Sequence, residues 1–389
     1  MNLLKTRSQK NGQITAHSRN LLKRFFQFNT YLFFTCICLI FLTISINGSK
    51  AIFTSKFPYI NTAFFTEKPQ TLYVYKPKWI IQKLSAMEAE SELIKQENSN
   101  YETKHSTLKK EILILEKQLL NETIKFTEYQ IQNSQEFDPN LYLRETYPFS
   151  AGGIAPALFG SIFLILGTFP IVFLMGLSSA IYLSEYSPND KTTKIIKNSI
   201  NALAGTPSII FGVFGYGIFV LAFGWGFSLL AGWLTIALMT LPTVISDCEI
   251  ALKRIPERER MNAIALGASK WQSIRHNVLP YSINEIFAST LFNIAKTSGE
   301  AAPIMFTAAY AFRDKLPWQG LENWHDFFFQ GVMALPYHIY ILSVKLPINA
   351  YTRDMQYGAA FIFLLFVGSL SMLGIYLKQL SINKQKPYL

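Results

Sequence analysis

Six long apolar blocks limit what this chain can fold into more than any other feature of its sequence. A helix needs about 20 apolar residues to cross the hydrocarbon core of a bilayer. The blocks reach that length and carry few charges, so we predict an all-α integral membrane protein with six transmembrane helices. The blocks cover residues 25–47, 154–183, 199–222, 227–245, 283–309 and 357–377.

Positive charge lies mainly between these blocks and gives the chain a net charge of +11. Basic segments next to membrane helices tend to stay in the cytoplasm, which assigns all of them to one side. Six crossings also put both termini on one side, in agreement with that assignment. The bilayer therefore accounts for the charge, and we expect no nucleic-acid partner. The basic segments are the arm 1–24, the loop 185–197, the loop 247–282 and the tail 381–389.

Residues 48–150 form an insertion between the first two blocks. It begins with an aromatic-rich extended part, and its segment 84–129 is polar and helical. Apolar residues recur there every seven positions, which predicts a coiled coil or a helical hairpin outside the cytoplasm. The insertion is either a solvated segment without chemistry or a binding element. The recurring residues are Met87, Ile94, Tyr101, Leu108 and Leu115.

We call residues 247–282 the basic loop. The sequence of this loop predicts a helix, a turn, a second helix, a stop and then the fifth membrane helix. Gly267 divides it, because glycine can adopt the left-handed conformation that ends a helix. A capping-box pattern opens the second helix, a leucine–proline pair stops it, and another capping-box pattern opens the membrane helix. These signals are Ser269 with Gln272, Leu279 with Pro280, and Ser282 with Glu285.

A polar stripe runs along the fifth block. Ser289, Asn293, Lys296 and Glu300 step by four, three and four, and Lys296 and Glu300 can pair within one helix. Ionisable groups at membrane depth cost about 3 kcal/mol each, so they should face the protein interior or a watery cavity. The stripe is either part of a substrate path with a cationic centre that suits an anion, or a structural ion pair that fixes helix packing.

A second stripe of small and polar residues is predicted on the third block. Small residues allow membrane helices to approach closely, and they also line pathways, especially beside a proline break such as Pro207. Asn201 and Ser208 are therefore candidate path residues. The stripe consists of Asn198, Asn201, Gly205, Ser208 and Gly212.

Motifs for covalent chemistry are missing from the sequence. It contains no G-x-x-x-x-G-K-[ST] phosphate-binding loop, no G-x-S-x-G nucleophile turn and no H-E-x-x-H helix. Its five histidines lack metal-ligand spacing, and its three cysteines predict no disulfide framework. We therefore expect a protein that is not an enzyme and needs no cofactor, and any energy for transport must come from another subunit.

The basic loop resembles the coupling loop of ABC-importer permeases. The pattern of that family is E-A-A, three residues, Gly, nine residues, Ile, one residue, Leu-Pro. Ala263, Gly267, Leu279 and Pro280 stand in register with it. Met261 stands where the family usually has Glu, Asn262 replaces an Ala, and Asn277 takes the Ile position.

Three more stretches resemble the phosphate-specific permeases of the PstA type. Residues 201–212 read NALAGTPSIIFG and are similar to N-L-A-G-x-P-S-I-x-F-G; residues 298–303 read SGEAAP and are similar to L-G-E-T-A-P. Residues 334–340 read ALPYHIY and are similar to L-P-x-x-I-Y. Lys296 stands where these permeases usually have Arg, which keeps the positive charge without the bidentate fork of a guanidinium. The resemblance covers residues 152–377 and leaves out the insertion.

The resemblance implies a type I importer permease with a MetI-like domain over residues 151–380, in the bacterial inner membrane. It implies half of the translocation path of an ATP-driven phosphate importer. The implied partners are a homologous PstC-type permease, a cytoplasmic PstB-type ATPase dimer and a periplasmic phosphate-binding protein. Permeases for molybdate or sulfate, and a non-transporting envelope anchor that presents the helical segment, remain alternatives. The implied ATPase-coupling residues are Met261, Ala263, Gly267, Ser269, Leu279 and Pro280, and the candidate path residues are Lys296, Glu300, Asn293, Ser289, Asn201 and Ser208.

Overall fold

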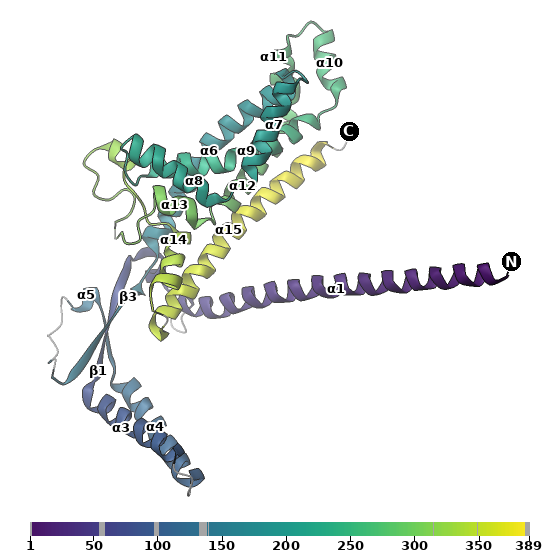
Figure 1. Cartoon of the computed structure of the whole chain (residues 1–389). Helices are drawn as coiled ribbons and strands as arrows, with labels where there is room; N and C mark the ends of the chain where they lie inside the picture. The colour runs from purple at the N-terminus through teal and green to yellow at the C-terminus, as the bar shows by residue number, and fades with distance from the viewer. Residues whose placement is uncertain are drawn as a thin grey trace.

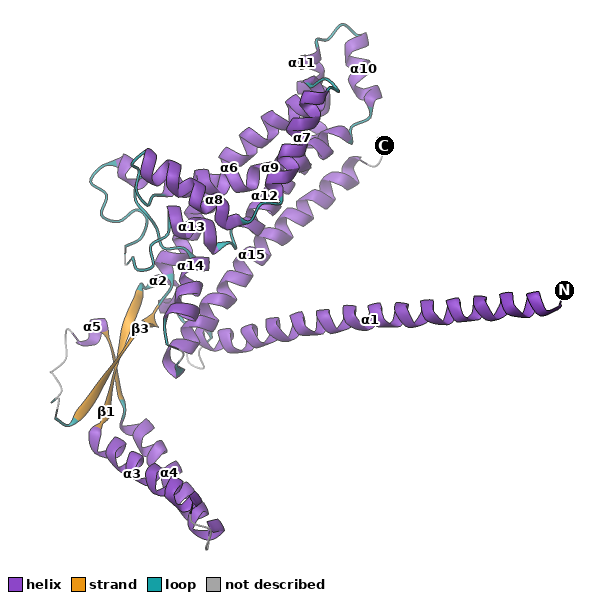
Figure 2. Cartoon of the chain, viewed as in Figure 1, coloured by secondary structure: helices purple, strands orange, loops and turns teal. Residues whose placement is uncertain are grey.

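A helical bundle and a smaller extension at one end make up the chain (Figures 1 and 2). The computed structural model describes the backbone of residues 2–53, 59–96, 101–131, 138, 140–313, 315–347 and 349–385. The side chains of residues 1–22, 94–106 and 382–389 lie outside the described part. Of the charged side chains of the basic arm and of the tail, only Lys23 and Arg24 therefore lie within the described part.

Four helices in the described part are long and apolar enough to cross a membrane. A bent pair of shorter helices is a fifth candidate, whereas the fifth apolar block is divided into two helices that are not among these candidates. The helical membrane bundle is thus confirmed, and the count of six crossings stays a prediction. The four helices are α1 (Asn2–Ile52), α6 (Ala155–Ile181), α9 (Leu229–Lys253) and α15 (Ala350–Gln385); the pair is α7 (Lys191–Ala204) and α8 (Ser208–Gly215); the fifth block forms α12 (Leu279–Thr297) and α13 (Ala301–Thr307).

The third apolar block does not form one straight helix. The axes of α7 and of the helix that begins at Ser208 differ by 99°. Pro207 lacks a backbone N–H and restricts Thr206 before it, so α7 ends at this point. The single stripe predicted from Asn198 to Gly212 is therefore wrong. Asn201 is exposed on α7, whereas Ser208 begins α8 beyond the bend.

The main apolar core lies between α6, α9 and α12, which pack against one another along their lengths. Close packing of small and branched side chains holds membrane helices together, because lipid supplies no hydrophobic driving force between them. The three helices therefore give the basic loop a common base. Core side chains include Val172 and Ala180 of α6, Val244 and Cys248 of α9, and Ile286 and Ile294 of α12.

The insertion contains a three-stranded antiparallel sheet in the order β2-β1-β3, with a helical hairpin at its far end (Figure 2). The hairpin agrees with one of the two structures predicted for 84–129. That segment is not helical throughout, however, because its last part forms β2; residues 97–100, between the two helices, lie outside the described part. The elements are β1 (Pro69–Pro77), α3 (Lys78–Gln96), α4 (Tyr101–Glu122), β2 (Ile124–Thr127) and β3 (Tyr142–Gly152).

Aromatic contacts fix this sheet to the bundle. Phe149, at the end of β3, stacks on Phe312 with ring centroids 4.6 Å apart, and Tyr147 lies 4.9 Å from Tyr351 at the start of α15. Lys125 of β2 lies over the same Tyr351 ring. The remaining short elements are α2 (Thr62–Thr66), α5 (Glu128–Ile131), α10 (Glu257–Ala265), α11 (Lys270–Ser273), α14 (Leu335–Tyr340), a 3-10 helix at Trp324–Phe327 and π-helical turns at Tyr182–Tyr186, Tyr216–Ala222, Ile274–Val278 and Ile341–Lys345.

Helix α1 packs against the bundle mainly where it crosses α15. The C-terminal part of α1 contacts α15, and the N-terminal part of α1 points away from the other helices (Figure 1). Gly48 makes the crossing possible, since a Cβ there would come within 2.5 Å of the Phe361 Cβ and of the Tyr357 carbonyl oxygen. Every residue from 23 to 43 is exposed in this chain.

Candidate functional site

The turn of the basic loop has the geometry that the sequence predicts. Gly267 has φ of +90°, in the left-handed region. Its N–H donates to the Ile264 carbonyl oxygen (2.9 Å), and the Ala268 N–H donates to the Ala263 carbonyl oxygen (3.1 Å). These two bonds form a Schellman motif, which satisfies the carbonyl groups left free at the end of α10. The left-handed glycine prediction is confirmed.

The second helix of the basic loop begins with the predicted capping box. The Ser269 N–H donates to Gln272 Oε1 (2.7 Å), and the Gln272 N–H donates to Ser269 Oγ (3.3 Å). This reciprocal pair satisfies two free N–H groups at the start of α11. The helix–turn–helix prediction therefore holds from Glu257 to Ser273.

The predicted stop at Leu279–Pro280 is wrong. The Leu279 N–H donates to the carbonyl oxygen of Ile274, five residues earlier, and the chain passes without a break from α11 into α12. Such a π-helical turn is wider than an α-turn and lets the chain accommodate Pro280, which has no N–H. Ser282 does not cap a helix, since its hydroxyl donates to the Val278 carbonyl oxygen at 3.0 Å. One continuous helical segment thus links the basic loop to the fifth block.

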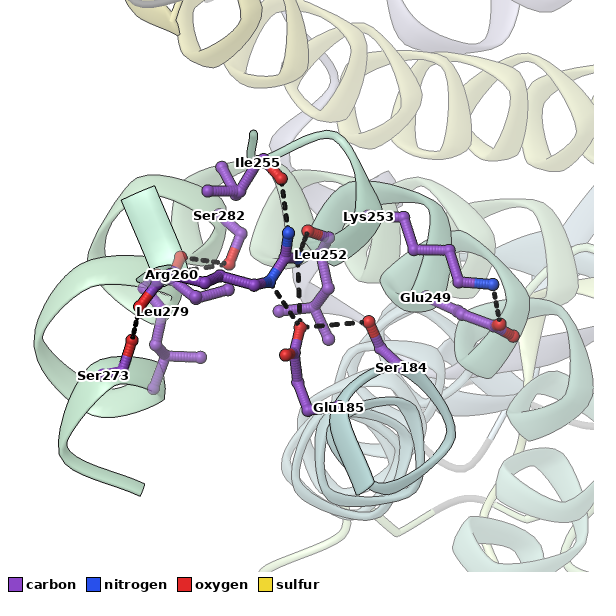
Figure 3. A network of polar contacts seen from close by, with 11 residues as sticks. Ser184, Glu185, Glu249, Leu252, Lys253, Ile255, Arg260, Ser273, Leu279 and Ser282 are labelled. Atoms are coloured by element: carbon purple, nitrogen blue, oxygen red, sulfur yellow. Dashed lines mark hydrogen bonds and ion pairs between the residues drawn. The ribbon is translucent and has the colours of Figure 1, made fainter. Parts of the chain in front are cut away.

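Arg260 of α10 connects the basic loop to two other helices (Figure 3). Its Nε and Nη2 both donate to Oε1 of Glu185, at 3.2 and 3.1 Å. Its Nη1 and Nη2 donate to the carbonyl oxygens of Ile255 (2.6 Å) and Leu252 (2.8 Å). Glu185 lies in the π-helical turn that extends α6, and its side chain is only 7% exposed. One guanidinium therefore neutralises a buried carboxylate at the end of α6 and satisfies carbonyls at and just beyond the end of α9.

Two more acidic residues connect the same helix ends. Glu285 of α12 pairs with Arg254, directly after α9, and its side chain is almost fully buried. Glu249 of α9 accepts hydrogen bonds from Lys197 of α7 and Lys253 of α9, each at 2.5 Å. Ion pairs around the base of the basic loop thus link α6 to α10, α7 to α9, and α12 to the residue after α9.

The two arms of the basic loop are also bonded to each other. Ser273 Oγ donates to the Arg260 carbonyl oxygen, and Asn277 Nδ2 donates to the Glu259 carbonyl oxygen, each at 3.1 Å. Asn277 occupies the position where the permease pattern has Ile, so its amide gives this departure a structural role. The loop therefore forms one bonded unit.

An apolar face of the basic loop remains open to solvent. Leu266, next to the turn, is 91% exposed and Met261 is 54% exposed; Ile264 and Trp271 are exposed beside them. A groove of ≈ 520 Å³ adjoins this face, between α10, α11 and the end of α9. Of the six predicted coupling residues, Met261, Gly267, Ser269 and Pro280 are exposed, whereas Ala263 and Leu279 are half-buried.

The predicted polar stripe of the fifth block divides into two parts. Ser289 and Asn293 are buried against α9, where Asn293 Nδ2 donates to Asp247 Oδ2 at 2.7 Å. Lys296 is exposed, and the structure gives it no ion pair or hydrogen bond with the described side chains. Glu300 is half-buried at the start of α13.

The predicted Lys296–Glu300 ion pair is wrong. α12 ends at Thr297, and Glu300 has an extended backbone (φ −89°, ψ 115°), so the two residues do not lie one helical turn apart. Glu300 instead lines a cavity of only ≈ 20 Å³ within the bundle. That volume holds about one water molecule and leaves no room for an oxyanion. Any path that uses Lys296 must therefore run along its exposed face.

Acidic residues at the ends of the apolar blocks were missing from the predicted site. Asp247 and Glu249 belong to α9, which continues to Lys253, and not to a loop that begins at residue 247. Glu185 and Glu285 also lie at block ends that face the basic loop. Their position at the ends of the apolar blocks is the sequence signal that could have identified these acidic residues. Within the described residues, no three His, Cys, Asp or Glu side chains gather as a metal site requires.

Residues 172–381 match the family described as "Binding-protein-dependent transport system inner membrane component". The phosphate transport system permease protein PstA 2 of Mycobacterium bovis is 31% identical over 60% of this chain and 73% of its own length. PstA of Yersinia pestis is 37% identical over 41% of this chain and 54% of its own length. A probable ABC transporter permease of Bacillus subtilis, YqgI, is 29% identical over 50% of this chain and 68% of its own length. A solved structure of the MetNI methionine ABC transporter aligns with 59% of this chain and 95% of its own chain, with 16% identity and a TM-score of 0.45.

Proposed function

This chain belongs to the family of binding-protein-dependent transport system inner membrane components and is a PstA-type permease of an ABC importer, and we propose that its substrate is phosphate. As a permease subunit of such an importer it is a multi-pass inner-membrane protein and not itself an enzyme. The family implies a partner ATPase and a substrate-binding protein.

The match to permeases named for phosphate transport is the observation that carries the substrate assignment. Lys296 supports it, because this cation is exposed on α12 and has no partner among the described side chains. Phosphate needs such a cation, and an ammonium binds it as a point charge. In this proposal, this chain's half of the path is formed by Lys296, Asn201 and Ser208. Glu300, Asn293 and Ser289 are less exposed than Lys296 and lie further inside the bundle.

The other half of the path comes from a homologous PstC-type permease in this proposal. Two observations support such a partner. Lys296 lies on the surface of this chain, and the internal cavity beside Glu300 is too small for an oxyanion. The exposed length of α1 supplies further apolar surface for lipid and for that partner.

A PstB-type ATPase dimer moves the basic loop in the proposed mechanism. The surface of the basic loop that contacts the ATPase is the turn at Gly267 with the exposed side chains of Met261 and Leu266. Movement of this loop reaches the path by two routes: the continuous helical segment into α12, and the Arg260 contacts with the ends of α6 and α9. A phosphate-binding protein delivers the substrate on the opposite side, where the insertion lies if both termini are cytoplasmic.

Uptake of radiolabelled phosphate tests this proposal. Phosphate-starved cells that lack the gene are complemented with the wild type, and sulfate and molybdate are added as competitors. We expect uptake to return and to resist both competitors. Competition by sulfate or molybdate would assign another oxyanion, and uptake that does not depend on the gene would favour an envelope anchor that does not transport.

A further inference from the structure

A cavity of ≈ 720 Å³ lies where α1 and α15 meet. Figure 1 shows that the two helices meet at the end of the bundle next to the insertion. The two helices touch at Gly48 and then diverge, which leaves a crevice between two candidate membrane spans. From α1, Ile44 lines the cavity, and residues 23–43 before it are exposed. The lining includes Ile44, Ile339, Ser343, Arg353, Tyr357 and Ala360.

The outer end of the cavity carries an available cation. Arg353 is exposed in the first turn of α15, and its guanidinium lies over the Tyr357 ring, 5.6 Å from the centroid. Among the described residues it forms no ion pair and no hydrogen bond. The adjacent Asp354 does not line the cavity. A guanidinium that rests with its face on an aromatic ring keeps its N–H edges free for the oxygens of a phosphate group.

The inner end of the cavity is apolar. Ile44 of α1 and Ala360 of α15 lie further along the two spans than Arg353, and Ile339 closes the wall. A free phosphate ion would make no use of these side chains. The lining thus changes from cationic to apolar along the direction in which a phospholipid changes from headgroup to acyl chain.

We propose that this cavity binds one anionic phospholipid from the leaflet on the insertion side. Its phosphate contacts Arg353, and an acyl chain lies in the crevice between α1 and α15. The bound lipid fills the space that α1 leaves when it diverges from the bundle. Arg353 lies in the first turn of α15, whereas Gly299, three residues after Lys296, faces Phe363 further along that helix. The lipid site does not depend on which substrate is transported.

Native mass spectrometry of the purified complex tests this site. The complex is extracted from membranes that contain phosphatidylethanolamine and phosphatidylglycerol. We expect about one retained phosphatidylglycerol per chain in the wild type, a loss of about tenfold in Arg353→Gln, and recovery in Arg353→Lys. Lys345→Gln, an exposed cation on the same side that does not line the cavity, is the matched control and should keep the lipid.

Delipidated complex with added inorganic phosphate distinguishes the two sources of a phosphate group. We expect any phosphate that is retained without lipid to be the same in wild type and Arg353→Gln. Retained phosphate that depends on Arg353 would overturn the lipid proposal in favour of an ion site. Equal phosphatidylglycerol in wild type and Arg353→Gln, or equal loss in Lys345→Gln, would also overturn it, because the bound lipid would then be general annular lipid.

Discussion

Arg260 and Glu185 lie 75 residues apart in the sequence and form one ion pair, in which two guanidinium nitrogens donate to a single carboxylate oxygen at 3.1 and 3.2 Å. The same guanidinium also bonds two carbonyl oxygens at the end of α9. A displacement of α10 must therefore either move the ends of α6 and α9 or break these bonds. This pair is the contact through which the basic loop acts on the bundle in our proposal.

Gly267→Ala and Gly267→Trp separate the conformation of the turn from its contacts with a partner. A side chain in the left-handed region costs about 1–2 kcal/mol, and a Cβ at Gly267 would meet nothing within 4 Å. We expect both variants to lower the free energy of unfolding by a similar small amount. Only Gly267→Trp should abolish substrate-stimulated ATP hydrolysis, because the indole occupies space that the ATPase would need.

Thermal unfolding and substrate-stimulated ATP hydrolysis of the purified complex measure these two effects. Gly267→Ala is the control, since it shares the backbone cost without the bulk. Normal coupling and uptake in Gly267→Trp would show that the turn does not contact the ATPase.

Lys296→Ala should reduce phosphate uptake about tenfold without changing stability. Lys296 is exposed and has no described partner, and substitutions at such positions change the free energy of unfolding by about 0.5 kcal/mol or less. Lys296→Arg should retain uptake and lower the KM for phosphate, because the guanidinium adds a bidentate fork. Initial uptake rates against phosphate concentration give the answer, with Lys345→Ala as the control. Unchanged uptake in Lys296→Ala would remove this residue from the path.

Asn293→Leu should destabilise the bundle by about 1–3 kcal/mol, because it leaves the Asp247 carboxylate without the one hydrogen bond that the structure gives it. The double variant Asn293→Leu with Asp247→Leu should recover most of that loss, since both polar groups are then gone. A double-mutant cycle on thermal unfolding measures the coupling. Additive effects would show that this pair does not hold α12 to α9.

The structure makes stability depend on pH through His338. Its side chain is 1% exposed and neither ring nitrogen has a described hydrogen-bond partner, so burial lowers the pKa of His338 to about 4. Unfolded protein then binds more protons than folded protein between about pH 6.5 and about pH 4. The stabilising contribution is complete above the unfolded pKa and is lost as pH falls, by about 3 kcal/mol in total.

Thermal unfolding from about pH 7 to about pH 4.5 checks this dependence. His338→Phe should flatten it, whereas the exposed His325→Phe should leave it as in the wild type. A His338→Phe profile as steep as that of the wild type would assign the pH dependence to other groups.

Local features of the basic loop could be predicted from the sequence. The conformation of Gly267 and the Ser269–Gln272 capping box depend only on residues within one helical turn, and both were predicted correctly. Pro280 was misread as a stop, because proline ends a helix only where the preceding turn cannot widen, and the π-helical turn before it does widen.

Contacts between distant segments could not be predicted in this way. Asp247 with Asn293 and Glu185 with Arg260 join residues 46 and 75 positions apart, and no local pattern encodes such pairs. The Lys296–Glu300 prediction assumed that a helix continues through Ser298–Gly299, where α12 in fact ends. The aromatic-rich extended part forms β1, but the sheet was missed, because β1 pairs with β2 and β3 across the helical hairpin and no local pattern encodes that pairing.

Transport by the whole reconstituted complex tests the role of the Arg260–Glu185 pair most directly. The measured quantity is phosphate imported into proteoliposomes per ATP hydrolysed, for wild type, Arg260→Gln and the matched control Arg258→Gln. Arg258 lies on the same helix, with a side chain 79% exposed; its one ion pair among the described residues is with Glu259, at 3.7 Å. We predict that Arg260→Gln lowers this ratio about tenfold or more, because α10 then moves without α6 and α9, while Arg258→Gln leaves it unchanged. A wild-type ratio in folded Arg260→Gln complex would contradict this account.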